Sequence, residues 1–217
     1  GSKLINASAD PGGLAVSMKL SAAINRQTAA ITNVQNAISF VQLQDGDLSA
    51  AASIVDRMAA LRSMYDDVTK SDVDKSNYNT EFQTLRVQLY QSTEGQFNGV
   101  SLFATTAEVK GSTQAVFGGN NSVDHTMSIY TSERGSAGSL VSINKSALLS
   151  AVTFLNTSNA TAVAFADNGG ATTKSFAADG STNTVNLDNL GVSFFTAALE
   201  NIATLRAANG ATTSRLQ

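Results

Sequence analysis

Two long segments with helical apolar spacing, one at each end of the chain, constrain this sequence more than any other feature. Near the N-terminus Ile24, Ile31 and Ile38 recur every seven residues, and a second ladder, offset by three, contains Leu20, Val34, Val41, Leu48 and Val55. This spacing keeps one narrow face of a helix apolar and predicts a helix of about 50 residues. Near the C-terminus the same three-four spacing joins Val192, Phe195, Leu199 and Ile202. We therefore expect the two ends to pack side by side in one elongated bundle, with the middle of the chain at its far end.

Local signals predict where the first helix begins and how it continues. The segment Asp10-Pro11-Gly12-Gly13 is expected to break a continuous helix, because proline fixes φ and glycine is costly in a helix interior. The apolar period then covers residues 14–65. After Val55 it shifts by one position, which is the drift of a straight helix with about 3.6 residues per turn.

A second helix is predicted to fold back on the first. Residues 70–75 are expected to form a turn in which the Ser71 side chain accepts a hydrogen bond from the backbone near Asp74. The apolar positions that follow, at spacings of four, three and four, are Tyr78, Phe82, Leu85 and Leu89, and the helix should end near Gln91. From Leu187 the chain is predicted to return to helix, with Asp188 or Asn189 as the cap.

The middle of the chain has the composition of strands and loops. Phe97-Asn98-Gly99 contains a strong turn dipeptide. Residues 115–117 and 127–130 lie on either side of a Gly-Gly-Asn-Asn turn and predict a β-hairpin. A short helix is predicted within 145–155. Residues 156–186, rich in Asn, Thr, Ser, Ala and Gly, are expected to form an exposed loop with one or two weak strands.

The predicted fold is therefore mainly α with a small β part. We expect an elongated antiparallel helical bundle of a long N-terminal helix, a second helix and a C-terminal helix, with a β-hairpin and a loop-rich tip. Residues 1–110 would form the N-terminal half of the rod, 111–186 the hairpin and variable tip, and 187–217 the C-terminal helix that completes the rod. Such a shape suits assembly better than catalysis.

Charge and composition exclude several classes of partner. A net charge of −3 and a pI near 5.1 provide no basic field, so neither nucleic acid nor an anionic membrane is an expected partner. No apolar run approaches the roughly 18 residues of a membrane helix, and the first residues lack the pattern of a cleavable signal peptide. The chain has no cysteine, which excludes disulfides and thiolate metal sites.

No catalytic site, metal site or cofactor is predicted, and we expect the protein not to be an enzyme. His125 is the only histidine, so it cannot form a His-rich metal site, and no second signal supports a Ser-His-Asp arrangement. We expect it to be an exposed turn residue. The paired carboxylates Asp66 with Asp67 and Asp72 with Asp74 lie at predicted helix ends, where a helix N-terminus or solvent stabilises them.

Several collinear segments resemble the conserved terminal regions of bacterial flagellin. They are residues 5–17, 36–42, 94–100, 117–120 with 127–129, and 199–216. Together they cover both ends of the chain and the predicted hairpin. The resemblance implies a structural subunit of the flagellar filament, which self-assembles into a helical polymer for motility.

The resemblance also implies a location and a set of partners. Subunits of this family leave the cell through the secretion channel of the flagellum, without a cleavable signal peptide, and polymerise outside the cell. The implied partners are other copies of the same chain, an export chaperone and the cap protein. The outermost terminal segments, which form an inner coiled coil in the family, are missing here, and Gly1-Ser2 resembles a cloning scar. We therefore expect a core fragment that is monomeric.

The predicted hairpin is a candidate subunit contact. The resemblance places Phe117, Met127, Ile129 and Tyr130 at the axial junction between stacked subunits, where small sliding would let the filament switch between supercoiled forms. The residues alone are equally compatible with a two-stranded cap over the bundle core.

A second candidate surface is a contact for an innate immune receptor. Arg57, Leu61 and Glu81 match positions through which flagellins are recognised by a Toll-like receptor. The surrounding motif departs from that of the family, since Ala59 and Ala60 replace an Arg-Glu pair. Interface energy concentrates in a few anchors, so Arg57 and Leu61 keep this surface a candidate. The alternative is that Arg57 is a solvated helix residue and Leu61 is part of the bundle core.

Two other classes of protein share part of this pattern. The hook-filament junction protein has the same terminal rod pattern, although the Phe-Asn-Gly and Gly-Leu-Ala-Val matches favour flagellin. A helical surface adhesin would need an exposed apolar patch on the tip, where the available aromatic residues are Phe154, Phe165 and Phe176. We expect these to fill a small local core. Ser and Thr within 156–186 are candidate sites for O-linked sugars or belong to a solvated loop.

Overall fold

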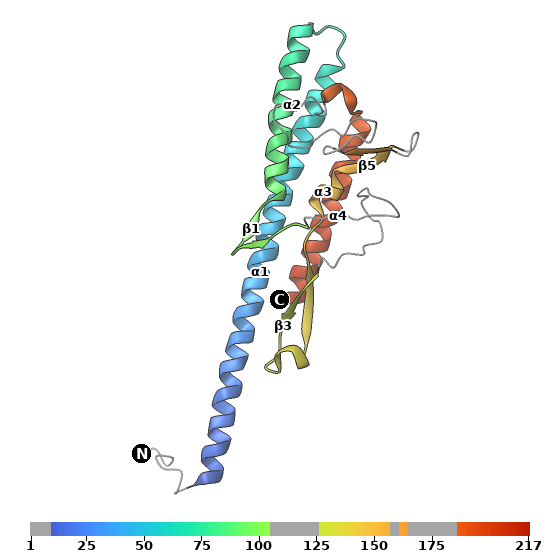
Figure 1. The fold of residues 1–217 in the computed structure, drawn as a ribbon. Coiled ribbons are helices and arrows are strands. Elements are labelled where there is room, and N and C mark those ends of the chain that lie inside the picture. The colour runs from blue at the N-terminus through green and yellow to red at the C-terminus, as the bar shows by residue number, and fades with distance from the viewer. Residues whose placement is uncertain (1–9, 105–125, 157–160, 165–185) are drawn as a thin grey trace.

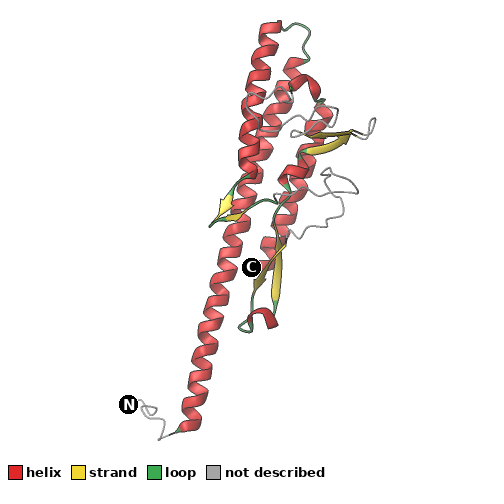
Figure 2. Cartoon of the chain, viewed as in Figure 1, coloured by secondary structure: helices red, strands yellow, loops and turns green. Residues whose placement is uncertain are grey.

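The computed structural model describes residues 10–104, 126–156, 161–164 and 186–217 of the chain. Within these residues the molecule is elongated and mainly helical, with small antiparallel strand pairs along its side (Figure 1, Figure 2). The predicted fold class, mainly α with a small β part, is confirmed.

The elements follow one another from a long helix through short strands to a final helix. The helices are α1 (Pro11–Tyr65), α2 (Asp72–Thr93), α3 (Leu148–Ala151) and α4 (Val192–Leu216), with 3₁₀ turns η1 (Gly135–Ala137) and η2 (Leu187–Asn189). The strands are β1 (Gln96–Phe97), β2 (Val100–Ser101), β3 (Thr126–Tyr130), β4 (Leu140–Asn144), β5 (Thr153–Asn156) and β6 (Thr161–Ala164). They pair as β1 with β2, β3 with β4 and β5 with β6.

The C-terminal helix lies beside the N-terminal helix, as the apolar ladders predict. α4 packs along the C-terminal half of α1 (Figure 1). The ladder on α1 is buried at Val41, Leu48 and Val55, and the facing stripe of α4 contributes Phe195 and Ile202, both fully buried. These residues belong to one hydrophobic core. The core therefore joins residues far apart in the sequence.

The N-terminal part of α1, up to Arg26, which contacts the connection between β3 and β4, projects beyond the other described elements (Figure 1). In the N-terminal half of α1 five large apolar side chains are more than half exposed, namely Val16, Met18, Leu20, Ile24 and Ile31. The ladder predicted from sequence is thus continuous along α1, but α4 covers only its C-terminal part.

The start of α1 corrects one expectation. Asp10 to Gly13 was expected to break a helix, yet the helix begins at Pro11 and contains both glycines. Proline is tolerated in the first turn, because the N–H that it lacks has no helical partner there. Asp10 caps this end by accepting a hydrogen bond from the Gly13 N–H at 2.8 Å.

The predicted cap at Ser71 is confirmed, but the helix begins at Asp72, inside the predicted turn, and is longer than expected. Ser71 and Asp74 form a reciprocal capping box, in which each side chain accepts a hydrogen bond from the other residue's backbone N–H. α2 begins at Asp72, before the first predicted apolar position. Phe82 and Leu89 are fully buried, and Phe82 packs edge to face on Phe195 of α4, with ring centroids 6.4 Å apart.

The β1–β2 hairpin confirms the turn predicted at Phe97-Asn98-Gly99. Phe97 pairs with Val100, and the two residues between them have positive φ, 50° at Asn98 and 78° at Gly99. This is the conformation of a two-residue turn for which Asn-Gly is preferred.

The partner of the strand at 127–130 differs from the prediction. β3 pairs with β4 (Leu140–Asn144), in a register that places Met127 opposite Ile143. Leu140-Val141-Ser142-Ile143 was not recognised as a strand, because its connection to β3 contains a 3₁₀ turn rather than an Asn-Gly turn. The expected partner, residues 115–117, lies outside the described residues.

The position of the hairpin also differs from the expected far end of the rod. The β3–β4 hairpin lies along the shaft, beside the middle of α1 and near the C-terminus (Figure 1). The turn between α1 and α2 forms the far end instead. The reason is that α2 carries the chain back along α1 before the first strand begins.

Two shorter elements correct the predicted boundaries. The helix expected within 145–155 is a single turn, α3, and is followed by β5. α4 is capped by Gly191 rather than by Asp188 or Asn189, which lie in η2. Leu187 and Leu190 are buried, so this segment is fixed by apolar contacts to the bundle before the helix starts.

Candidate functional site

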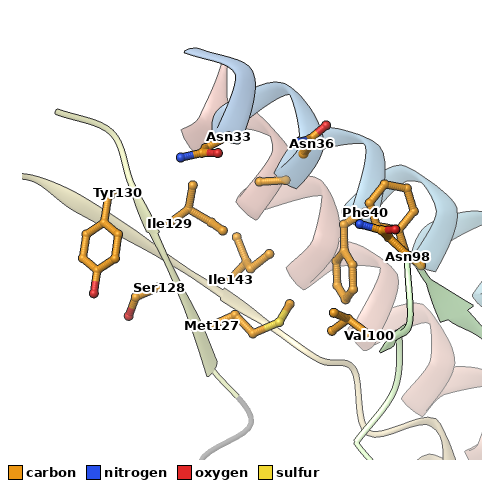
Figure 3. A pocket seen from close by; sticks show the side chains of 12 residues that line it. Asn33, Asn36, Phe40, Asn98, Val100, Met127, Ser128, Ile129, Tyr130 and Ile143 are labelled. Atoms are coloured by element: carbon orange, nitrogen blue, oxygen red, sulfur yellow. The ribbon is translucent and has the colours of Figure 1, made fainter. Parts of the chain in front are cut away.

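An open groove of about 650 Å³ separates the β3–β4 hairpin from α1 (Figure 3). Three elements supply its walls: α1, the β1–β2 turn and the hairpin. The lining residues are Asn33, Asn36, Ala37, Phe40, Phe97, Asn98, Val100, Met127, Ser128, Ile129, Tyr130 and Ile143. The groove therefore brings together three of the four residues predicted as a subunit contact, Met127, Ile129 and Tyr130. Phe117, the fourth, lies outside the described residues.

The strand period explains how the hairpin contributes to the groove. Side chains alternate along β3, so Met127 and Ile129 are half-buried whereas Thr126, Ser128 and Tyr130 are exposed. In Figure 3 Met127 lies next to Phe40 and Val100, and Ile129 lies beside Ile143. The floor of the groove is therefore apolar.

Amide side chains flank the groove, and an ion pair between α1 and the hairpin connection lies beyond them. Asn33 and Asn36 of α1 and Asn98 of the β1–β2 turn are exposed. Beyond them Arg26 of α1 contacts Glu133, in the connection between β3 and β4, at 3.5 Å. Phe97 packs edge to face on Phe40, with centroids 6.0 Å apart. Apolar walls with an uncharged polar rim suit a protein segment better than an ion.

The far end of the rod carries a second exposed apolar feature. In the turn between α1 and α2, Val68 is 93 % exposed, and Val73 in the first turn of α2 is 69 % exposed. The turn is well ordered by local bonds, since the Asp67 carboxylate accepts hydrogen bonds from the backbone N–H and the hydroxyl of Thr69. These bonds lower the pKa of Asp67. We call residues 66–73 the distal turn.

The three predicted receptor residues lie close together, but only Arg57 and Glu81 reach the surface. Arg57 Nε of α1 donates to Glu81 Oε1 of α2 at 2.6 Å, and both side chains are about half exposed. This hydrogen bond raises the pKa of Arg57. Leu61, one turn further along α1, is fully buried in the core. The exposed part of this candidate surface is therefore the Arg57–Glu81 pair.

The buried polar groups near the groove serve packing between elements. Gln44 of α1 is fully buried, and its Nε2 donates to the carbonyl oxygen of Leu102. Asn209 of α4 is 4 % exposed, and its Oδ1 accepts from the Ser146 hydroxyl at 3.2 Å. These bonds tie the chain between the strands to both long helices.

Across the described part of the chain there is no cluster of three or more His, Asp or Glu side chains that could hold a metal ion. His125 lies outside that part. None of the described helices has the length and apolar character needed to cross a bilayer. Partial burial raises the pKa of Asp47, which lies beside Gly95.

The fold is that of a rod-shaped helical protein with an open groove along its shaft. Residues 1–108 match the family model described as the bacterial flagellin N-terminal helical region. The chain belongs to the bacterial flagellin family, whose members are structural proteins rather than enzymes.

Individual relatives agree with this assignment. The chain is 32 % identical over 103 residues to the flagellar filament 31.3 kDa core protein of Treponema maltophilum, covering 47 % of this chain and 36 % of the relative. It is 32 % identical over 109 residues to a flagellin of Halalkalibacterium halodurans, covering 50 % and 40 % of the two chains. It is 28 % identical over 105 residues to the flagellar filament 41 kDa core protein of Borreliella burgdorferi, covering 48 % and 31 %. The matched region thus spans less than half of each of these relatives.

Proposed function

We propose that this chain is a structural subunit of the bacterial flagellar filament, located outside the cell and assembled from many copies of the same chain. The observation that supports it most is the rod itself, in which α4 pairs with α1, together with relatives named as filament core proteins. Export through the flagellar secretion channel, with an export chaperone and the cap protein as partners, belongs to the same proposal.

Two features of the rod suit an open-ended contact between copies. The groove lies beside Phe40, near the middle of α1, whereas the distal turn lies at the far end of the rod, about 40 Å away at 1.5 Å per helical residue. A contact between two different surfaces of the same chain is heterologous and generates a filament rather than a closed dimer. We propose that the distal turn of one copy, led by Val68, docks in the groove of the next.

The exposed stripe on the N-terminal half of α1 supplies a further surface for assembly. Val16, Leu20, Ile24 and Ile31 are more than half exposed and recur at helical spacing on one face of α1, so they form a patch of the kind that marks a protein interface. In the proposed filament this stripe packs against helices of other copies. The groove contact is small, so it should require this larger surface for stable polymers. The chain alone is therefore expected to be a monomer by light scattering, and polymers at micromolar concentration would contradict this.

Variants of the full-length protein test the docking. Met127→Asp places a charge on the apolar floor of the groove, and Val68→Asp places one on the distal turn. Both should abolish filaments seen by electron microscopy and motility in soft agar. Val192→Asp is the control, because Val192 is exposed but lies outside both surfaces. Circular dichroism of the purified chains checks that each variant folds. Normal filaments from both Met127→Asp and Val68→Asp would overturn the docking.

We also propose that the Arg57–Glu81 pair is the exposed centre of a contact with a Toll-like receptor, with Leu61 supporting it from the core. Surface plasmon resonance against the receptor ectodomain tests this. Arg57→Ala should weaken binding, whereas Arg215→Ala, at the exposed end of α4, should not. Absence of binding by the unchanged chain at high concentration would remove the proposal.

A further inference from the structure

The Asn98-Gly99 turn combines a reactive dipeptide with an open environment. In an Asn-Gly pair the glycine has no side chain to hinder attack of its backbone nitrogen on the asparagine amide. The described residues hold two such pairs, Asn98-Gly99 in the β1–β2 turn and Asn209-Gly210 in α4. They have the same chemistry in opposite surroundings, so the structure contains its own control.

Asn98 is exposed, and the space around Gly99 is empty. A Cβ atom built on Gly99 would meet nothing within 4 Å, so water and hydroxide reach the peptide between the two residues. The hairpin ladder joins Phe97 to Val100, and the Gly99 N–H lies between these paired positions. It is therefore not held by the ladder.

Asn209, in contrast to Asn98, is buried. Its side chain is 4 % exposed, and its Oδ1 accepts a hydrogen bond from Ser146. Gly210 lies within α4, where backbone N–H groups are engaged in helical hydrogen bonds. The same attack at Asn209 requires α4 to open locally first.

We propose that Asn98 is a site of spontaneous amide loss, at which the chain converts to aspartate and isoaspartate. Hydroxide removes the Gly99 N–H proton, and the nitrogen attacks Cγ of Asn98. An N–Cγ bond forms, the Cγ–Nδ2 bond breaks and ammonia leaves, which gives a five-membered succinimide. Water then opens the ring at Cγ to give aspartate, or at the backbone carbonyl carbon to give isoaspartate.

Both products change the groove. Asn98 lines it beside Phe40 (Figure 3), so either product places a carboxylate at that end of the groove. Isoaspartate also lengthens the backbone of a two-residue turn by one methylene, which disturbs the pairing of Phe97 with Val100. If the groove docks a second copy of the chain, conversion weakens that contact. This last consequence rests on the proposed function, whereas the reaction does not.

Peptide mapping by mass spectrometry tests the site without any assay of assembly. Trypsin cleaves after Arg86, Lys110, Arg206 and Arg215, so Asn98 and Asn209 fall in separate peptides, 87–110 and 207–215, each with one asparagine. The folded chain is incubated at mildly alkaline pH, and a parallel sample is kept in concentrated urea. In buffer, peptide 87–110 should gain the mass of an amide-to-acid change at least about tenfold faster than 207–215, since about 1.4 kcal/mol of opening free energy gives that factor. In urea the two rates should become similar.

Three results would overturn the proposal. The first is equal rates for the two peptides in buffer. The second is conversion of 87–110 in urea alone, because the folded turn would then protect Asn98. The third is an undiminished mass gain in the Asn98→Asp variant, which lacks the amide and would place the change at a glutamine of the same peptide. Conversion of Asn98 without a filament defect would support the reaction and contradict the docking. A filament defect without conversion of Asn98 would contradict the reaction and leave the docking supported.

Discussion

Arg206 of α4 forms a two-bond ion pair with Asp45 of α1, in which Nε donates to Oδ1 at 3.0 Å and Nη2 donates to Oδ2 at 3.2 Å. The two residues are 161 positions apart in the sequence. A planar guanidinium matches a carboxylate in only a few orientations, and the bond raises the pKa of Arg206. This pair is therefore formed only when α4 has its observed register along α1.

The first prediction concerns this pair. Arg206→Lys removes the two-bond geometry and keeps the charge, so it should lower the free energy of unfolding by about 0.2–1 kcal/mol, since both side chains are substantially exposed. A double-mutant cycle with Asp45→Asn, measured by urea denaturation at low and high salt, should give a coupling that shrinks with salt. Arg215→Lys is the matched control. Additive effects of the two substitutions would show that the pair does not set the register.

The second prediction concerns the core between α2 and α4. Phe195 is fully buried and packs edge to face on Phe82. Phe195→Ala should lower the free energy of unfolding by about 3–5 kcal/mol, through lost burial and the cavity left behind. Val192→Ala, in the exposed first turn of the same helix, should change it by less than about 0.5 kcal/mol. Similar small losses for both variants would mean that α4 is not packed on the bundle as described.

The third prediction concerns the polar group buried in α1. Gln44→Leu leaves the Leu102 carbonyl without its donor, which should cost about 1–3 kcal/mol of unfolding free energy. Gln42→Leu makes the same change at an exposed position of the same helix and should be close to neutral. Thermal and urea unfolding of the two variants measures the difference. Equal stability of the two would contradict the buried position of Gln44.

The fourth prediction concerns pH and the capping box. Hydrogen bonds from the Ser71 hydroxyl and backbone N–H lower the pKa of Asp74 below its usual range. A lowered pKa in the folded state means that the contribution of Asp74 is present above the unfolded pKa, about 3.9, and is lost as the pH falls through the folded pKa.

The Asp74→Asn variant tests this sign. Its melting temperature should be below that of the unchanged chain at neutral pH, and the two should converge as the pH falls below about 3.9. A gap that stays constant with pH would show that the carboxylate charge plays no part in the cap.

Much of this fold could be predicted from sequence, because its long elements have strong periodic signals. The seven-residue ladder indicated the length of α1 and its pairing with α4, and Ser71 with Asp74 marked the start of α2. Asn98-Gly99 indicated the turn between β1 and β2. The signals for the cap and the turn lie within a few residues of these elements, and the signal for the long helix repeats over many helical turns.

The rest depends on contacts that no local pattern contains. β4 is a five-residue strand that was not recognised, and β3 was predicted to pair with another segment, because pairing is decided by how the hairpin packs between the two long helices. The start of α4 was misplaced, since burial of Leu187 and Leu190 holds the preceding segment in a 3₁₀ turn. Of the candidate site, Met127, Ile129 and Tyr130 could be predicted from the sequence. The contributions of Asn33, Asn36 and Asn98 to the groove were missed, because polar residues on a helix or turn give no sign of what lies opposite.

Immunogold labelling of native cells with an antibody raised against this chain tests the central claim most directly. A structural subunit of the filament should be labelled along the whole length of each flagellum. Labelling at a single position between hook and filament would instead indicate a junction protein, and labelling of the cell body an adhesin. Either of those two patterns would contradict a structural role along the filament.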